Sequence, residues 1–432
     1  MGDAVADSAG PRRMYRADSA ATRARGAALA DQPSSDSAHG LDWFVFFLAD
    51  VQTGFGPFIA VYLTTQKWTQ VEIGAVLSVG GLIALLGQMP GGAIVDWARS
   101  ERLLAGIAVA AIGCCAMAYA AWPIFPVVLL AAVVHAAASC VLGPAIAAIS
   151  LGLVGPAAMG HRLGRNARFA SLGSGVAAAA MGACGYLVSS RSVFIVTLVL
   201  AIPTLIALAH IRAREIDPDR AHGAALERAA ASPHETSVAI VGLSRSLLTF
   251  ALIMGLFQLA NAAMLPLVAS TVTARSRSWA PALIGACMVI PQIVVAAISP
   301  WVGGRAHLWG RRPLLLIGVS ALVLRGLLFA FVREPDLLIV VQVLDGVTAA
   351  IIGVLVPLTV VDVTFGTGHF NLAQGLVGTA TGLGATISTL FAGYLSDRYD
   401  SEVAFLALSG VALISLGLIW LAMPETRPNR DG

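Results

Sequence analysis

The chain has 432 residues, of which 57% are hydrophobic and only 12% are charged. Soluble globular domains carry about 25% charged residues, so this composition excludes an ordinary soluble protein. The net charge of +3 comes almost entirely from arginines in short polar segments, which excludes the continuous basic surface of a nucleic-acid-binding protein. All five cysteines lie in apolar stretches, as small buried side chains do, so we expect neither a bound metal nor a cofactor.

Twelve apolar stretches reach the length of about 20 residues that a membrane-spanning helix needs. Residues 1–40 precede them and are rich in Ala, Ser, Asp, Gly and Arg, so we expect a disordered cytoplasmic tail. The longest internal polar segment, 213–240, separates six spans from six. It predicts a cytoplasmic linker between bundles at 41–212 and 241–423, with a second cytoplasmic tail at 424–432. The expected spans are roughly 41–65, 71–95, 103–122, 126–153, 166–189, 192–212, 241–271, 279–302, 313–332, 337–363, 372–396 and 403–423.

The arginine distribution predicts the orientation of these spans. If the N-terminus is cytoplasmic, the tails and the even-numbered connections hold 20 of the 27 Lys and Arg residues, and the opposite side holds six. Positively charged loops favour the cytoplasmic side, so we expect both termini there. The short loops and the Ala- and Arg-rich composition favour a bacterial inner (plasma) membrane.

The two halves of the chain share an internal repeat. His135 and Gly143 recur 210 residues later as Asp345 and Gly353. A duplicated apolar chain is typical of a transporter with a substrate path between two bundles. Two further pairs recur after 208 residues, Gly160-His161 as Gly368-His369 and Gly185-Tyr186 as Gly393-Tyr394.

Twelve spans in two halves with a central linker resemble the major facilitator superfamily over residues 41–423. The family's most specific mark is a loop of pattern Gly-x-x-x-Asp-(Arg/Lys)-x-Gly-(Arg/Lys)-(Arg/Lys) after the second span of each half. Here Gly92 and Asp96 match in the first copy, and His307 stands at the Asp position of the second. We expect Asp96 to hold a gate closed through ion pairs; the alternative is a helix-end charge without a switching role. The gating candidates are Gly92, Asp96, Arg99, Arg102, Gly303, His307, Gly310, Arg311 and Arg312.

Three ionisable residues within the spans are candidates for proton coupling or substrate binding, because a charge at mid-membrane costs at least about 2.5–3.5 kcal/mol. Asp50 precedes Gly54-Phe-Gly56-Pro57, which should loosen the first span. His135 and Asp345 occupy equivalent repeat positions, and the resemblance implies that both face the central cavity. The alternatives are a hydrogen bond from Asp50 to nearby backbone, and a structural ion pair of Asp345 with Arg325, which lies at similar depth one hairpin away.

Polar uncharged side chains within the spans either line the cavity or hydrogen-bond between helices, and the spacing leaves both open. These candidates are Gln52, Thr53, Gln258, Asn261, Gln292, Gln342, Thr348, Asn166 and Gln374.

The resemblance implies secondary transport of a small organic solute by alternating access. The scarcity of acidic groups in the spans suits a neutral, zwitterionic or amphipathic solute, and coupling to protons rests on the three ionisable candidates. The family favours export, although span 5 lacks the Gly-Pro motif of its drug exporters. An uncoupled facilitator and an uptake symporter are the alternatives. An intramembrane enzyme or a sensor on the same scaffold is a remote one, because the chain has no motif for a nucleophile, zinc or ATP site. We therefore expect a monomeric transporter in the lipid bilayer that has no catalytic residues and no nucleic-acid partner.

Overall fold

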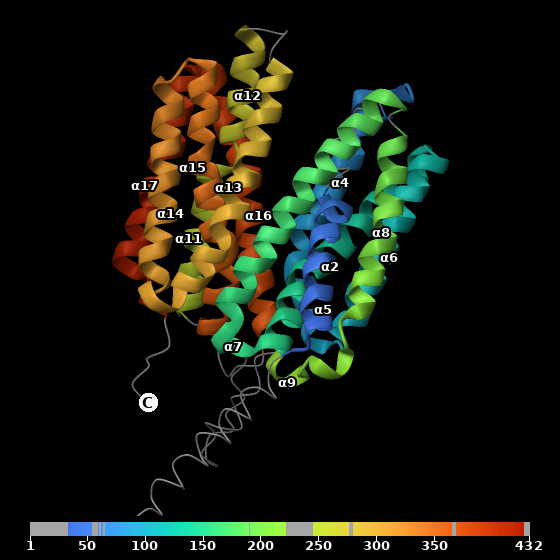
Figure 1. Ribbon diagram of the computed structural model, residues 1–432. Coiled ribbons are helices and arrows are strands. Elements are labelled where there is room, and N and C mark those ends of the chain that lie inside the picture. Colours follow the sequence, from blue (N-terminus) through green and yellow to red (C-terminus); the bar gives the residue numbers. More distant parts are fainter. Residues whose placement is uncertain are drawn as a thin grey trace, which may run out of the picture.

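The computed structural model describes residues 33–53, 59, 62–63, 65–189, 191–221, 245–275, 280–364 and 369–426. These residues fold into helices arranged as two bundles (Figure 1). The first bundle contains α2 (Ser35–Thr53), α4 (Gln70–Leu86), α5 (Gln88–Trp97), α6 (Glu101–Ala121), α7 (Phe125–Leu187) and α8 (Ser192–His210). The second contains α11 (Arg245–Asn261), α12 (Met264–Arg275), α13 (Ala280–Trp309), α14 (Arg311–Phe331), α15 (Pro335–Val363), α16 (Phe370–Arg398) and α17 (Ser401–Ala422).

Nine helices in the described part of the chain are long and apolar enough to cross a membrane, or ten if the bent pair α4 and α5 forms one span. The 57-residue apolar stretch of α7, Phe125–Met181, is counted once, although it covers the expected span 126–153 and most of the expected span 166–189. The first expected span, 41–65, begins in α2 and continues through residues that are only partly described. These two places account for the difference from the twelve predicted spans.

Gly155 divides α7 into two arms. Its backbone has φ 68° and ψ 173°, a left-handed conformation that glycine adopts without steric cost. Pro156 follows and starts the second arm, where a missing backbone N–H is tolerated. The sequence at this point therefore ends one span and begins the next with no connecting loop.

Each bundle encloses its own apolar core. In the first, the hydroxyl of Tyr62 donates to the backbone oxygen of Tyr119 at 3.0 Å, and the rings of Tyr62 and Phe194 have centroids 4.8 Å apart. In the second, the rings of Phe329 and Phe405 lie 5.5 Å apart. The core of the second bundle also takes in Ala147, Leu151, Met159 and Leu163 of α7, which pack against it.

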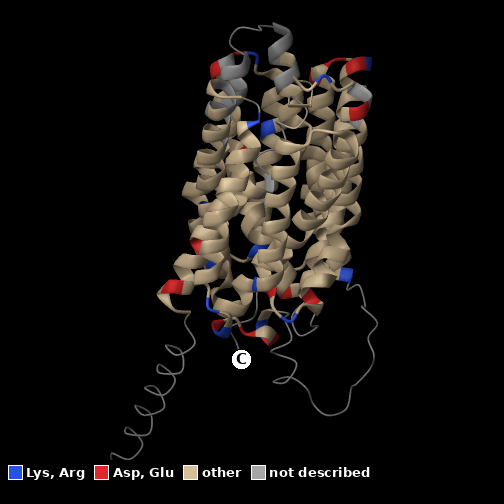
Figure 2. Cartoon of the chain, turned by 90° about the vertical axis from the view of Figure 1, so that its right-hand side faces the viewer, with Lys and Arg blue, Asp and Glu red and all other residues tan. Residues whose placement is uncertain are grey.

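The two bundles meet at one end of the molecule and diverge toward the other (Figure 1). The end where they meet holds the short helix α9 (Pro218–Ala221) and the C-terminal part of the chain, and we call it the joined end. Charged residues gather at the two ends of the helices, with few between them (Figure 2). This distribution fits helices whose middle portions lie in a hydrocarbon layer.

The structure differs from the expected tail and linker at one boundary of each. Helix α2 begins at Ser35 rather than near residue 41, because the Ser34 hydroxyl accepts from the Ser37 N–H at 3.3 Å and donates to Glu215 at 2.9 Å. The first residues of the expected linker are also ordered: Ala213–Glu215 form a 3-10 turn, and α9 packs against α7. The rest of the expected tail (1–32) and linker (222–240), and the end of the second tail (427–432), lie outside the described residues.

Candidate functional site

A cavity of about 510 Å³ lies between α5, α11, α15 and α16. Four polar side chains face it, and the described part of its wall holds no Lys, Arg, Asp or Glu. Gln258 and Gln374 were cavity candidates from the sequence, whereas Gln88 and Thr381 were not identified. Gln88 could have been identified as a candidate, because it is a polar residue among the apolar residues of the expected span 71–95. The lining residues are Gln88, Phe257, Gln258, Ile352, Gly353, Val356, Pro357, Gln374, Gly378, Thr381, Gly382 and Ala385.

Other polar candidates lie between helices instead. Thr348 is buried and its hydroxyl donates to the backbone oxygen of Gly318 in α14 at 3.0 Å. The Asn166 amide donates to the Ser150 hydroxyl at 2.8 Å, within the first bundle. Gln342 is fully buried beside Cys287 of α13. These contacts join neighbouring helices and do not face the cavity.

Two further candidates, Gln292 and Asn261, are not among the described residues that line the cavity. Gln292 is half-buried in α13. Asn261 is the last residue of α11, at the break between α11 and α12. For Asp50, Gln52 and Thr53, only the backbone is among the described parts of the structure.

Arg325 and Asp345 form an ion pair that joins α14 to α15. The Arg325 side chain is 2% exposed, while that of Asp345 is 23% exposed. Arg325 also donates to the backbone oxygen of Asn261 at 3.5 Å, where α11 gives way to α12. At the same break, the Ala263 N–H donates to the Ser388 hydroxyl of α16 at 3.0 Å. The pair and Ser388 therefore hold both sides of an interruption in one span.

His135, at the repeat position of Asp345, lies in the first arm of α7. The thiol of Cys115, in α6, lies beside the backbone of His135. Cys115 stands 210 residues before Arg325, the same offset that separates His135 from Asp345. Neither His135 nor Asp345 is among the described residues lining the central cavity. The contacts described for Asp345 and for His135 thus each lie inside one bundle.

Asp96 crosses from the first bundle to the second at the joined end. Its carboxylate accepts from the Asn371 side-chain amide at 2.8 Å, the Asn371 backbone N–H at 3.3 Å and the Leu372 backbone N–H at 2.8 Å. These two backbone donors belong to the first turn of α16, where the helix dipole and unpaired N–H groups favour an anion. A Cβ at Gly92 would collide with the backbone carbonyl of Asn371, so this seam requires glycine.

The second copy of the motif makes the equivalent seam between α13 and the second arm of α7. Gly303 packs directly on Gly160 and Gly164, and any Cβ at Gly303 would collide with the Gly160 carbonyl. The imidazole of His307 lies beside Gly160, with Nε2 3.0 Å from the position that a Gly160 Cβ would take. This seam thus repeats the close backbone contact with a histidine in place of the carboxylate.

The basic residues of the motif make contacts within their own bundles. Arg311 binds Asp362 of α15 at 2.7 Å, and its backbone N–H donates to Glu425 at 2.8 Å. The Arg312 N–H also donates to Glu425, at 3.1 Å, and its side chain donates to the backbone oxygen of Trp420. Gly310 precedes them with φ 90°. In the first bundle, Arg102 donates to the backbone oxygen of Ile211 at 2.5 Å, and Arg99 is exposed.

A buried charge cluster near the joined end was not identified from the sequence. Asp42 of α2 is 1% exposed and pairs with both Arg162 and Arg165 of α7. Arg162 also donates to Asn166 at 2.8 Å. The available signal was the i, i+3, i+4 spacing of Arg162, Arg165 and Asn166 beside an acidic residue at the start of the first span. The cluster fixes α2 to the second arm of α7.

Comparison with known proteins agrees with this architecture. The sequence pattern of the Major Facilitator Superfamily matches residues 43–270 and 250–432. Two Mycobacterium tuberculosis proteins, from strains CDC 1551 and H37Rv, are described as uncharacterized MFS-type transporters. Each is 39% identical over 395 residues, covering 90% of this chain and 93% of the relative.

Two solved structures share the fold at low sequence identity. The human organic anion transporter MFSD10 (TETRAN) has a TM-score of 0.67 and 16% identity, over 89% of this chain and all of that one. The proton:xylose symporter XylE, bound to 6-bromo-6-deoxy-D-glucose, has a TM-score of 0.68 and 13% identity, over 91% of this chain and 96% of that one.

Proposed function

The chain belongs to the major facilitator superfamily, and we propose that it moves an uncharged organic solute through the central cavity, coupled to protons at Asp345. Membership confirms the predicted family and the predicted all-α fold of two pseudo-symmetric bundles, and it makes the chain a membrane transporter of a solute. The solute class, the proton and the direction are our proposals.

The cavity supports the solute class. Its volume of about 510 Å³ falls within the range of about 300–1,000 Å³ that small-molecule sites occupy. The cavity wall offers the amide and hydroxyl groups of Gln88, Gln258, Gln374 and Thr381. These groups can donate to or accept from the hydroxyl and amide groups of a solute, and they can donate to an ether oxygen. Because the described wall carries no charge, an ionic solute would lose its hydration without a counter-charge. A neutral, partly apolar solute fits best.

Alternating access is supported by the seams at the joined end. Backbone contacts at Gly92 and Gly303 bring the bundles together there, and Asp96 adds a charged hydrogen-bonded contact. We propose that the joined end faces the cytoplasm, because the arginine bias assigns the tails and even-numbered connections to that side. The solute would then reach the cavity from the opposite side in this conformation.

The proposed proton coupling at Asp345 is based on the ion pair of this residue with Arg325. The Asp345 side chain is 23% exposed, whereas that of its partner Arg325 is 2% exposed, and we propose that Asp345 is the group that takes up the proton. Protonation removes the negative charge and leaves the Arg325 charge unpaired, which is costly in a buried site. Arg325 also holds the backbone oxygen at the break between α11 and α12. Proton binding would therefore weaken the contact that fixes this interrupted span, and so favour a change of conformation.

The test uses the full chain in vesicles that contain a pH-sensitive dye. A panel of neutral sugars, polyols, amides and amphipathic drugs is added, and amino acids and organic anions serve as charged comparisons. We expect proton movement with neutral solutes only. Comparing right-side-out with inside-out vesicles tests the direction, for which the sequence favours export.

The variant Asp345→Asn should move solute without protons. Since this change leaves Arg325 unpaired, the double variant Arg325→Gln/Asp345→Asn provides a neutral pair as a folding control. Proton movement that persists in the double variant would remove Asp345 from the coupling step. Solute movement without protons in the unmodified protein would make the chain a facilitator, and preference for an anion would overturn the proposed solute class.

A further inference from the structure

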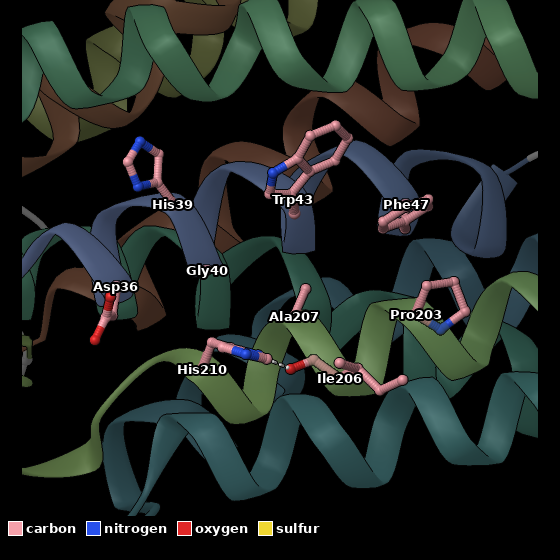
Figure 3. Close-up of a pocket in the computed structure, with 9 residues that line it drawn as sticks. All are labelled: Asp36, His39, Gly40, Trp43, Phe47, Pro203, Ile206, Ala207 and His210. Carbon is pink, nitrogen blue, oxygen red and sulfur yellow. Dashed lines mark hydrogen bonds between the residues drawn. The ribbon is translucent and has the colours of Figure 1, made fainter.

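A groove of about 320 Å³ runs along the outer seam of α2 and α8, apart from the central cavity and from both seams between the bundles. Small residues form its floor: Gly40 touches α8 so closely that a Cβ there would lie 3.1 Å from the Ala207 backbone oxygen. Large side chains form its walls, and Figure 3 shows Trp43, Phe47, Pro203 and Ile206 along the two helices. Side chains of both helices therefore line the groove.

The groove extends from the polar ends of α2 and α8 to the apolar part of both helices. Its polar end holds Asp36 in the first turn of α2 and His210 at the last position of α8. From there it passes Trp43, which is 48% exposed, and Ile206, which is 54% exposed. The exposed side of α8 continues toward the middle of the span with Ile202. Aromatic and aliphatic groups in this order match the border between lipid headgroups and acyl chains.

The polar end presents acceptors for a cation that carries N–H groups. His210 Nδ1 lies 2.8 Å from the backbone oxygen of Ile206, as the dashed line in Figure 3 shows. Since a carbonyl oxygen only accepts, Nδ1 is the donor in this contact, which leaves Nε2 as the ring nitrogen that can meet a ligand. Asp36 adds a carboxylate that is 59% exposed and is bound by Arg212 at 2.7 Å.

We propose that this groove binds phosphatidylethanolamine, with its ammonium at Asp36 and His210 and one acyl chain along Trp43 and Ile206. Arg212 lies between two carboxylates, 2.7 Å from Asp36 and 3.5 Å from Glu215, so the polar end of the groove offers negative groups beside one positive group. A zwitterionic headgroup matches this order, because its ammonium meets Asp36 while its phosphate meets Arg212. The choline of phosphatidylcholine has no N–H to donate, and phosphatidylglycerol brings a phosphate without a cation to neutralise Asp36.

Binding is tested on the delipidated full chain by native mass spectrometry. Phosphatidylethanolamine, phosphatidylcholine and phosphatidylglycerol with the same acyl chains are titrated separately. We expect phosphatidylethanolamine to bind about tenfold more tightly than the other two, since a hydrogen bond to a charged group contributes about 1.5–3 kcal/mol. Equal binding of the three lipids, or preference for phosphatidylglycerol, would overturn the proposal.

Two variants locate the site. Asp36→Asn and His210→Phe should each lower the affinity for phosphatidylethanolamine about tenfold and leave phosphatidylcholine unchanged. The matched control is Glu402→Gln, because Glu402 is also an exposed acid in the first turn of a helix, paired with Arg333. It should keep the lipid preference of the unmodified protein. If both test variants keep it too, the headgroup is bound elsewhere and the assignment is wrong.

Discussion

The two seams at the joined end are built on the same repeat but differ in chemistry. Both rely on a glycine that meets backbone of the opposite bundle, Gly92 on Asn371 and Gly303 on Gly160. Only the first adds a carboxylate that binds the N–H groups of a helix start, through Asp96. Close packing of backbone is therefore common to both copies, whereas a carboxylate on a helix start occurs in the first.

The same contrast appears inside the bundles. Positions related by 210 residues hold the ion pair Arg325–Asp345 in the second bundle, and Cys115 beside the backbone of His135 in the first. The two halves therefore share a contact between helices at equivalent positions, but only the contact in the second half is an ion pair. We infer that the second bundle carries the coupling step and the first carries the latch.

The largest effect is expected from filling the seams. Gly92→Leu and Gly303→Leu should each lower transport more than about tenfold, because overpacking a tight contact costs about 1–3 kcal/mol or more. Gly304→Leu is the matched control, since no atom lies within 4 Å of a Cβ at Gly304. The initial rate of solute uptake into vesicles measures the loss. If Gly303→Leu and Gly304→Leu are equally active, the second seam does not close the path.

The next largest effect is a difference in stability between variants of the Arg325–Asp345 contact and of the Cys115–His135 contact. Asp345→Asn should lower the free energy of unfolding by about 3–5 kcal/mol, because it leaves a buried charge without its partner. Cys115→Ala should cost about 1 kcal/mol. Replacing both charges, in Arg325→Met/Asp345→Leu, should recover most of the lost stability. Thermal unfolding in detergent measures all three, and equal losses at Asp345 and Cys115 would contradict the contrast.

A smaller effect is expected at the latch itself. Asp96→Asn should weaken the closed state by about 1 kcal/mol, the usual contribution of a charged cap at a helix start. His307→Asn should change it less, because the second seam depends on backbone contact. The test is the labelling rate of a single cysteine at Gln374 by a membrane-impermeant reagent added at the joined end. Faster labelling only in Asp96→Asn is the expected result.

The smallest effect concerns the attachment of α2 near the joined end. Burial raises the pKa of Glu215, but hydrogen bonds from Ser34 and Ser37 and the charge of Arg212 outweigh it, and the net pKa is lowered. A lowered pKa in the folded state adds stability above the unfolded pKa, and this is lost as the pH falls through the folded value. Glu215→Gln should therefore lower the melting temperature slightly at pH 7 and not at pH 3. Equal lowering at both pH values would contradict this role.

The sequence predicted the fold well because the signals for it are long and repeated. Apolar stretches of about 20 residues and the offsets of 208–211 residues indicated twelve spans in two halves. Spacing also brought Arg325 to the depth of Asp345, and the structure places them in contact. Sequence did not place the partners of Asp96, because a helix start in the other bundle leaves no local pattern.

The cavity wall was the least predictable part. Gln258 and Gln374 line it, but Thr348 and Asn166, which have similar polarity and similar settings in the sequence, join helices instead. Which face of a helix meets the other bundle depends on its rotation, and a helix with apolar residues all round shows no amphipathic stripe to fix it.

The central claim is that Asp96 holds the joined end closed while the matching His307 does not. Spin labels at Trp97 and Leu308, which are 86% and 52% exposed on α5 and α13, report the distance between the bundles there in a chain whose native cysteines are replaced. Double electron–electron resonance should show a larger long-distance population in Asp96→Asn and an unchanged distribution in His307→Asn. An unchanged distribution in Asp96→Asn, or an equal shift in both variants, would contradict the account.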